Sequence, residues 1–252
     1  MAVDVASGAS GGHGERSTSG VIRFDGGRIV AVVWALPALA VAGGIAREVA
    51  AVMAGVPSPN FGHQMVNLDS EANFPTAVSA LLMVFAALLL FVQARRPGVT
   101  TSPDRMRWLI LSGGFLYLAM DEVAQFHEQF KAPLRAMAQF DDWLSFAWVV
   151  IAIPVVFVLG AYYLPLLFRL PARIRLGLAA SGALYVAGAI GMEMVGGRLA
   201  TYSGWGSSYY VTGVIVEEAL EFAGVALFIT VLLQLLRPVR VSIDAVERAT
   251  PR

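Results

Sequence analysis

The strongest constraint in this sequence is a series of apolar runs, each long enough to cross a lipid bilayer. A helix needs about 20 residues to cross the hydrocarbon layer. Hydrophobic residues make up 57% of the chain and charged residues only 14%, which is too apolar for a domain surrounded by water. We therefore predict an all-α polytopic membrane protein with about six transmembrane helices. They are expected at residues 29–54, 74–94, 107–128, 142–168, 176–196 and 210–236.

The distribution of arginine predicts how this bundle is oriented. Fourteen of the 18 basic residues fall in the two tails and in the loops that follow the second and fourth runs. Loops rich in Lys and Arg stay in the cytoplasm, so both termini are predicted to be cytoplasmic. The six-helix domain is expected at 28–237. Residues 1–27 and 238–252 are polar tails, and the first is too rich in Gly and Ser to bury a core, so we expect it to be disordered.

Composition excludes several classes of protein. The formal net charge is zero, so no basic surface is predicted for nucleic acid. The chain has no cysteine, which excludes disulfides and thiolate metal ligands. It also lacks a Walker or dinucleotide-binding glycine motif. The only lysine, Lys131, lies in a predicted loop, so a retinal Schiff base is not expected. Nothing in the sequence indicates an oligomeric state.

The acidic residues show the opposite asymmetry to the arginines. Twelve of the 18 lie toward the predicted outer face, and His127 lies among them. A carboxylate at mid-bilayer costs about 2.5 to 3.5 kcal/mol, so such residues require compensation and usually serve a function. Eight of these acids are predicted to lie within helices: Glu48, Asp121, Glu122, Glu128, Glu193, Glu217, Glu218 and Glu221.

The charge of these carboxylates can be compensated in three ways: by shared protons, by pairing with Arg47 or Arg198, or by a bound cation. Two arginines cannot neutralise eight acids, which favours protons or a cation. On a continuous helix, Asp121, Gln125 and Glu128 share one face. Glu217, Glu218 and Glu221 likewise converge on one neighbouring helix.

Purely structural interpretations remain open for several residues. The helix acids can form a purely structural network, and His127 can be an interfacial histidine. Arg47 and Glu48 are interpreted as a solvated pair at a helix end. Loop residues His63, Asp69 and Glu71 are expected to be solvated, and Asp141 and Asp142 to cap the next helix.

The leading hypothesis is a divalent-metal-dependent membrane enzyme that hydrolyses a lipid-like or amphipathic substrate. A bound metal lowers the pKa of its water, and an unligated glutamate accepts the proton. The catalytic candidates are Glu128 and Glu218. The candidate metal ligands are Asp121, Glu122, His127, Glu193, Glu217 and Glu221. The alternatives are a non-enzymatic membrane protein that binds a metal or a partner, and a proton-coupled or cation transporter. The apolar inner halves of the helices argue against transport.

Several strings in the chain resemble a family of bacterial six-helix membrane proteins. They are NFPTAVSALL, LAMDEVAQFHE, FAWVVIAIP, LPARIRL, GAIGMEMVGG and EEALEFAGVALFI, and together they cover about residues 65–236. The resemblance implies a location in the bacterial cytoplasmic membrane. It also implies that the acids of the DE-x4-HE, GMEM and EE-x2-E motifs act as a set. It implies no reaction, substrate or cofactor.

Overall fold

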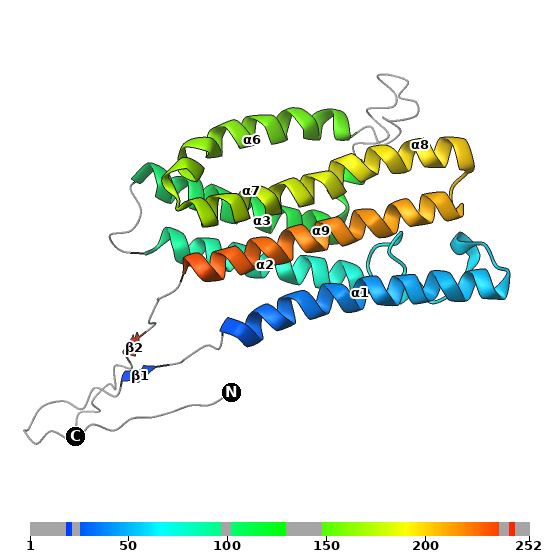
Figure 1. The fold of residues 1–252 in the computed structure, drawn as a ribbon, viewed down its shortest axis with the longest axis horizontal. Coiled ribbons are helices and arrows are strands. Elements are labelled where there is room, and N and C mark those ends of the chain that lie inside the picture. The colour runs from blue at the N-terminus through cyan, green and yellow to red at the C-terminus, as the bar shows by residue number, and fades with distance from the viewer. Residues whose placement is uncertain (1–18, 22–25, 97–101, 130–147, 237–241, 245–252) are drawn as a thin grey trace, which may run out of the picture.

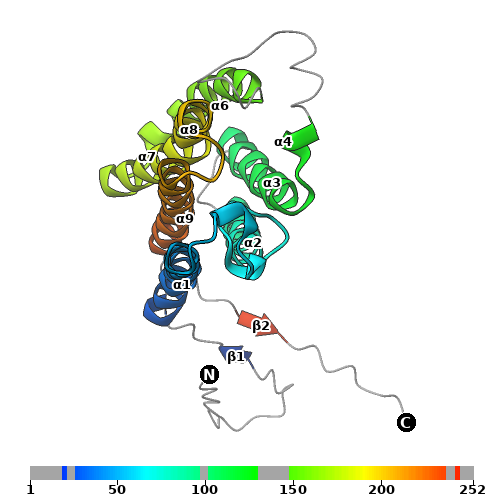
Figure 2. The same ribbon diagram turned by 90° about the vertical axis from the view of Figure 1, so that its right-hand side faces the viewer.

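The computed structural model shows a bundle of roughly parallel helices, with the short strands β1 (Ser19–Val21) and β2 (Ser242–Asp244) of the two tails at one end (Figure 1). It describes residues 19–21, 26–96, 102–129, 148–236 and 242–244. The helices are α1 (Gly26–Ala54), α2 (Phe74–Ala94), α3 (Ser102–Ala124), α4 (Phe126–Gln129), α6 (Val149–Arg169), α7 (Ala172–Val186), η4 (Ala187–Met192), α8 (Glu193–Ser203) and α9 (Ser208–Leu235). Short 3-10 turns η1 (Ser58–Asn60) and η2 (Gln64–Val66) interrupt the segment between α1 and α2. In the end-on view, α1, α9, α7 and α6 follow one another, and α2 and α3 lie on the other side (Figure 2).

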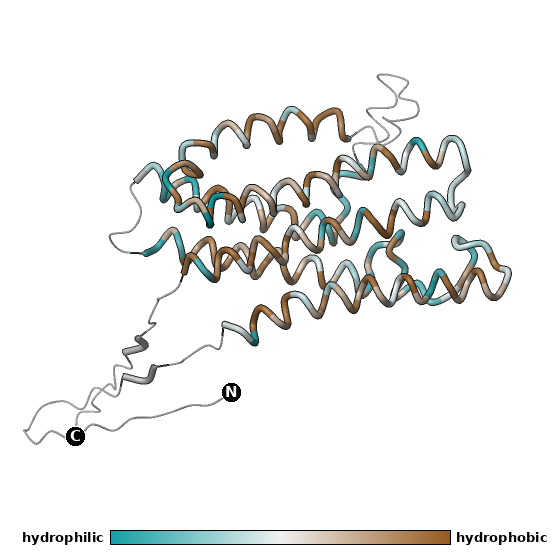
Figure 3. Tube along the Cα trace, in the orientation of Figure 1, coloured by the Kyte–Doolittle hydropathy of each residue, from teal (hydrophilic) through white to brown (hydrophobic). Residues whose placement is uncertain are grey.

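Four of the described helices are long and apolar enough to cross a membrane. They are α1, α2, α6 and the continuous helix Ala172–Ser203 formed by α7, η4 and α8. Hydrophobic residues dominate the lengths of these helices (Figure 3). The all-α class is confirmed, and the chain has the character of a membrane protein. Six spans and cytoplasmic termini go beyond this finding and stay predictions.

Helix α2 begins and ends where the sequence predicts. The Asn73 side chain caps it by accepting a hydrogen bond from the Thr76 backbone N–H, and Pro75 occupies the first turn, where its missing N–H costs nothing. Helix α2 packs against α3, α9 and α1. Its buried residues Met83, Ala86 and Leu90 belong to the main apolar core.

The long helix Ala172–Ser203 packs closely against α9. A Cβ atom on Gly224 would lie 2.7 Å from the Tyr185 backbone N, and one on Gly188 would lie 2.9 Å from the Glu217 carbonyl oxygen. Only glycine permits these approaches. This helix extends beyond the expected span 176–196 at both ends, and Gly196 and Gly197 are buried packing residues of α8.

The helix predicted over 107–128 is broken at Gln125. This residue adopts φ +54°, a backbone conformation that is unusual for any residue with a side chain. The Asp121 carboxylate receives the backbone N–H of His127, which stabilises a new turn, α4, at the expense of helix continuation. The prediction that Asp121, Gln125 and Glu128 share one helical face is therefore wrong.

The predicted helix 142–168 is described only from Val149 onward, and residues 142–147 lie outside the described part. Both tails contribute a short strand, β1 (Ser19–Val21) and β2 (Ser242–Asp244), which pair antiparallel. The rest of the two tails lies outside the described residues.

Candidate functional site

The half of the bundle farther from the tails contains a group of acidic side chains from several helices. We call Asp121, Glu122, Glu193, Glu217, Glu218 and Glu221 the carboxylate cluster. The segment 55–73 between α1 and α2 is called the cap. The sequence predicted that the acids of this cluster converge, and the structure shows which of them meet.

Asp121 and His127 form a close pair at the junction of α3 and α4. One carboxylate oxygen of Asp121 lies 2.8 Å from the imidazole Nδ1 of His127, and the other accepts the His127 backbone N–H at 2.9 Å. Two contacts to one carboxylate hold the ring in a single orientation. Asp121 therefore acts on His127, which separates it in role from the other acids of the cluster.

Trp148 connects this pair to α8. Its indole Nε1 donates to the Glu193 carboxylate at 3.1 Å, and its ring lies 5.4 Å from the His127 ring between centroids. Trp148 was not predicted as a site residue. A polar contact cannot be recognised from a tryptophan at the start of an apolar run.

Glu193 follows directly after the π-helical turn η4. Such turns interrupt regular helices and occur frequently at functional sites. The approach of Gly188 to Glu217 and Glu221 brings η4 against α9. A side-chain hydrogen bond joins Glu193 to Glu217. A hydrogen bond between two carboxyl groups forms only when one of them carries a proton.

Glu218 and Glu221 interact mainly with other acids, and Glu221 also interacts with His127. Glu218 interacts electrostatically with Glu122, and Glu221 interacts with both of them. The Glu122 carboxylate also accepts a hydrogen bond from Ser79 of α2. Electrostatic interactions among their acids therefore connect helices α3, α8 and α9.

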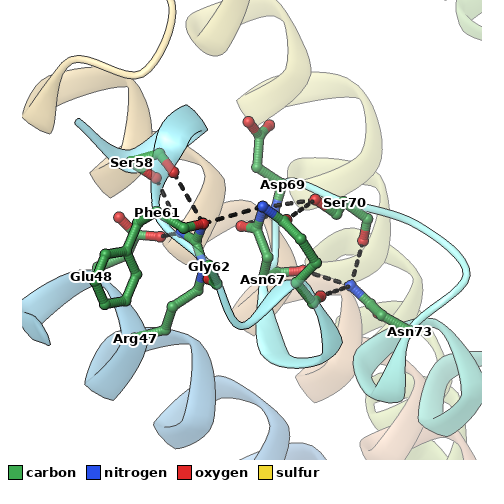
Figure 4. A network of polar contacts seen from close by, with 10 residues as sticks. Arg47, Glu48, Ser58, Phe61, Gly62, Asn67, Asp69, Ser70 and Asn73 are labelled. Atoms are coloured by element: carbon green, nitrogen blue, oxygen red, sulfur yellow. Dashed lines mark hydrogen bonds and ion pairs between the residues drawn. The ribbon is translucent and has the colours of Figure 1, made fainter. Parts of the chain in front are cut away.

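Arg47 does not neutralise this cluster. Its guanidinium donates all five N–H groups to the adjacent Glu48 and to the cap: Nε to the Gly62 carbonyl at 3.2 Å, Nη2 to the carbonyls of Ser58 and Phe61 at 2.9 and 2.8 Å, and Nη1 to the Ser58 hydroxyl and to Glu48. Figure 4 shows the guanidinium surrounded by the cap. With 3% of its surface exposed, Arg47 is buried, so its interpretation as half of a solvated pair is wrong. Arg198, the other candidate base, lies over the Tyr202 ring.

The cap adds two acids that were interpreted as solvated loop residues. Asp69 keeps an exposed surface, but its carboxylate accepts a hydrogen bond from the Tyr210 hydroxyl at 2.8 Å. Desolvation by the surrounding protein raises the pKa of Asp69, and the Tyr210 hydroxyl opposes this change. One carboxylate oxygen of Glu71 is shielded from solvent, so full solvation of Glu71 is wrong. His63 is exposed, as expected.

Other predicted residues stay apart or lie outside the description. Glu48 pairs with Arg47 instead of joining the cluster. The Glu128 side chain, Lys131, Asp141 and Asp142 are outside the described part of the chain. Tyr202, Trp205 and Tyr209 are exposed aromatic residues near the α8–α9 turn.

The donor set was tested for the predicted metal ion. Among the side chains that the structure describes, no group of three or more His, Asp or Glu residues is placed to hold a metal. Asp121 uses both oxygens on His127, and Glu193 is engaged by Trp148 and Glu217. The described residues of the assigned ligand set therefore do not fit a directly coordinated metal.

No curated protein and no solved structure shows a significant match to this chain. A family model matches residues 29–235, which include every helix of the carboxylate cluster. That match fits the resemblance to a membrane protein family without an assigned reaction. The chain belongs to the family described as Domain of unknown function (DUF8692).

Proposed function

We propose that this integral membrane protein binds a cation at the carboxylate cluster and releases protons as it does so. One observation carries the proposal: the cluster acids interact with one another, while Arg47 uses all its donors on Glu48 and the cap. Ionised carboxylates in a membrane bundle need a counter-charge or protons. We assign one such proton to the contact between Glu193 and Glu217, where an arriving cation would displace it.

An ammonium group or a hydrated cation suits this site better than a directly coordinated metal ion. Carboxylates on α8 and α9 accept hydrogen bonds from N–H or water, and no three-ligand group is present among the described residues. The Trp148 ring, beside Glu193, offers a π face to a positive group. This is the binding-protein alternative from the sequence, with an ammonium-type or hydrated cation in place of the metal.

The proposed location is the bacterial cytoplasmic membrane, with the cluster toward the outside. The arginine asymmetry supports this orientation, because the cluster lies on the side that has few basic residues. A soluble cation reaches such a site from outside, and a lipid-like amine reaches it from the outer leaflet.

The test is calorimetric titration of the purified protein in lipid nanodiscs. The probes are spermidine, a long-chain alkylamine, and Mg²⁺, Ca²⁺, Mn²⁺ and Zn²⁺, each in two buffers of different ionisation enthalpy, so that released protons are counted. We expect saturable binding of an amine probe with proton release, and its loss when Glu217→Gln and Glu218→Gln are combined.

The matched control is Asp244→Asn in the C-terminal tail, which removes an acid outside the cluster and should bind as the wild type does. Absence of proton-linked binding for every probe would overturn the proposal. Unchanged binding by the double variant would do the same. Tight binding of a divalent metal alone would restore the metal hypothesis.

A second candidate, an acid–base hydrolase, is favoured by the Asp121–His127 pair. A carboxylate that orients a histidine through Nδ1 is a common arrangement for a general base. Glu218, one predicted catalytic residue, lies in the cluster as a second proton acceptor. Turnover of a fatty acyl ester or amide in nanodiscs, lost in His127→Gln and reduced in Asp121→Asn, would support this candidate; no turnover by the wild type would dismiss it.

A further inference from the structure

The cap is fastened to the bundle at its first half by Arg47. A planar guanidinium that meets the carbonyls of Ser58, Phe61 and Gly62 fixes the path of five successive residues. The Phe61 ring also lies against this guanidinium, 5.7 Å from its carbon to the ring centroid. This half of the cap therefore depends on one side chain from α1.

The second half of the cap is fastened by packing and by two asparagines. The Asn73 amide donates to the carbonyls of Asn67 and Ser70, each at 2.6 Å, and the Asn67 amide bonds to Gln64 and Ser70 (Figure 4). Leu68 is buried against α1 at Gly44, where a Cβ atom would lie only 2.5 Å from the Leu68 side chain.

The cap places two of its acids, Asp69 and Glu71, near the carboxylate cluster. Asp69 is bonded to Tyr210 of α9 and interacts electrostatically with Glu193. Glu71 interacts with Glu122 of α3 and with Glu218 of α9. Residues 69 and 71 are thus connected to three of the helices that form the site.

We infer that Arg47 is a positioning residue for the cation site. It holds the backbone of the cap, and the cap in turn holds Asp69 and Glu71 as two further acids of the binding site. The inference rests on the proposed function. It assigns the cap as a fixed wall of the site, and it gives the buried arginine a task other than charge compensation.

Arg47→Lys tests the inference, because a lysine keeps the charge but cannot reach three carbonyls at once. We expect apparent affinity for the amine probe to fall about tenfold. The matched control is Arg96→Lys. Arg96 also donates to a backbone carbonyl, that of Leu235, but at the opposite end of the bundle, so this variant should bind as the wild type does.

An engineered disulfide separates positioning from general stability. A Cβ atom on Gly43 would lie 3.6 Å from the Cβ of Val66 in the cap, within the range for a disulfide, and the chain has no other cysteine. Gly43→Cys with Val66→Cys should therefore link α1 to the cap. In the Arg47→Lys background, oxidation should restore the affinity to near the wild-type value, and reduction should abolish the rescue.

A further variant tests whether Arg47 affects cation binding through the cap acids Asp69 and Glu71. When Asp69→Asn and Glu71→Gln are already present, Arg47→Lys should reduce affinity no further. A second tenfold loss in that background, or failure of the oxidised cross-link to restore affinity, would overturn the inference. Loss of binding on cross-linking the protein that retains Arg47 would also overturn it, because it would show that the cap must open.

The rate of cross-linking gives a readout that does not depend on binding. If the wild type binds no probe, the proposed function fails. The positioning role is then judged from the rate at which the cysteine pair forms its disulfide, which should be several times slower in the Arg47→Lys background if Arg47 fixes the cap. Equal rates would overturn the role of Arg47 independently of the cation.

Discussion

The bundle contains two groups of buried or half-buried acids, and the fold treats them differently. Near the tails, Asp104 is buried and accepts hydrogen bonds from Arg107 at 2.9 Å and Arg169 at 2.6 Å, which joins α3 to α6. In the carboxylate cluster, Glu193 bonds to Glu217, and Glu218 faces Glu122. The first group is complete as a structural ion network. In the second the described partners are mainly other acids, so the partners of an acid separate the two sites better than its burial does.

The largest loss of stability is expected when the ion network of Asp104 with Arg107 and Arg169 is broken. Asp104→Asn should lower the free energy of unfolding by about 3 kcal/mol, because it leaves Arg107 partly buried without its counter-charge. Denaturant unfolding in detergent, followed by tryptophan fluorescence, measures the loss. A change below about 1 kcal/mol would show that this network is no more structural than the cluster.

A smaller loss is expected where the cluster is packed most closely. Gly188→Ala should cost about 2 kcal/mol, because the new methyl group would meet Glu221 Cγ at 2.8 Å and the Glu217 carbonyl oxygen at 2.9 Å. The matched control is Gly191→Ala in the same π turn, where no atom lies within 4 Å of the new Cβ. The same unfolding measurement compares the two variants, and equal stability would contradict the close contact between η4 and α9.

Within the carboxylate cluster, removal of an acid should stabilise the protein instead of destabilising it. Glu218→Gln should increase the free energy of unfolding by about 1 kcal/mol, because the neutral amide replaces a buried acid that interacts unfavourably with Glu122 and Glu193. Glu48→Gln, the control, should decrease it, because Glu48 pairs with the buried Arg47. Destabilisation by Glu218→Gln would show that its charge is compensated in the resting protein.

A similarly small change in stability is expected where α9 contacts the cap. Tyr210→Phe should cost about 1 kcal/mol and should raise the pKa of Asp69 further, because the lost hydroxyl donates to the ionised carboxylate. NMR titration of the Asp69 carboxyl carbon measures the change. Tyr209→Phe at the exposed neighbouring position should leave that titration unchanged.

The direction of the pKa shift of Asp69 determines how the stability of the protein changes with pH. The folded-state pKa of Asp69 lies above its usual value, so the contribution of this group to stability is present at low pH and is lost as pH rises through the folded-state pKa. The Tyr210 hydroxyl reduces that loss. In Tyr210→Phe the decline in stability with rising pH should therefore be steeper.

Local signals explain which elements were predicted well. Helix α2 matches its predicted bounds because Asn73 and Pro75 mark its start and an apolar run of spanning length follows. The convergence of α3, α8 and α9 was predicted from the cost of acids in apolar helices. Both inferences use properties of neighbouring residues or of the solvent, which the chain carries in its sequence.

The remaining features depend on specific side-chain contacts that hydropathy and spacing do not reveal. No local pattern marks Gln125 as a break, because the turn is stabilised by Asp121 reaching His127. Arg47 and Glu48 resemble a solvated pair until the cap folds over them and supplies acceptors. The same reason accounts for Trp148, whose partner Glu193 lies 45 residues away.

The sequence by itself determined the apolar helices and the excess of acids over bases in the half away from the tails. These follow from the cost of exposing backbone or charge to lipid, which every residue pays locally. Only the tertiary structure decided that Asp121 orients His127, that Glu193 lies against Glu217, and that Arg47 holds the cap. Those roles depend on distances of about 3 Å between individual atoms, and hydropathy and spacing carry no information at that scale.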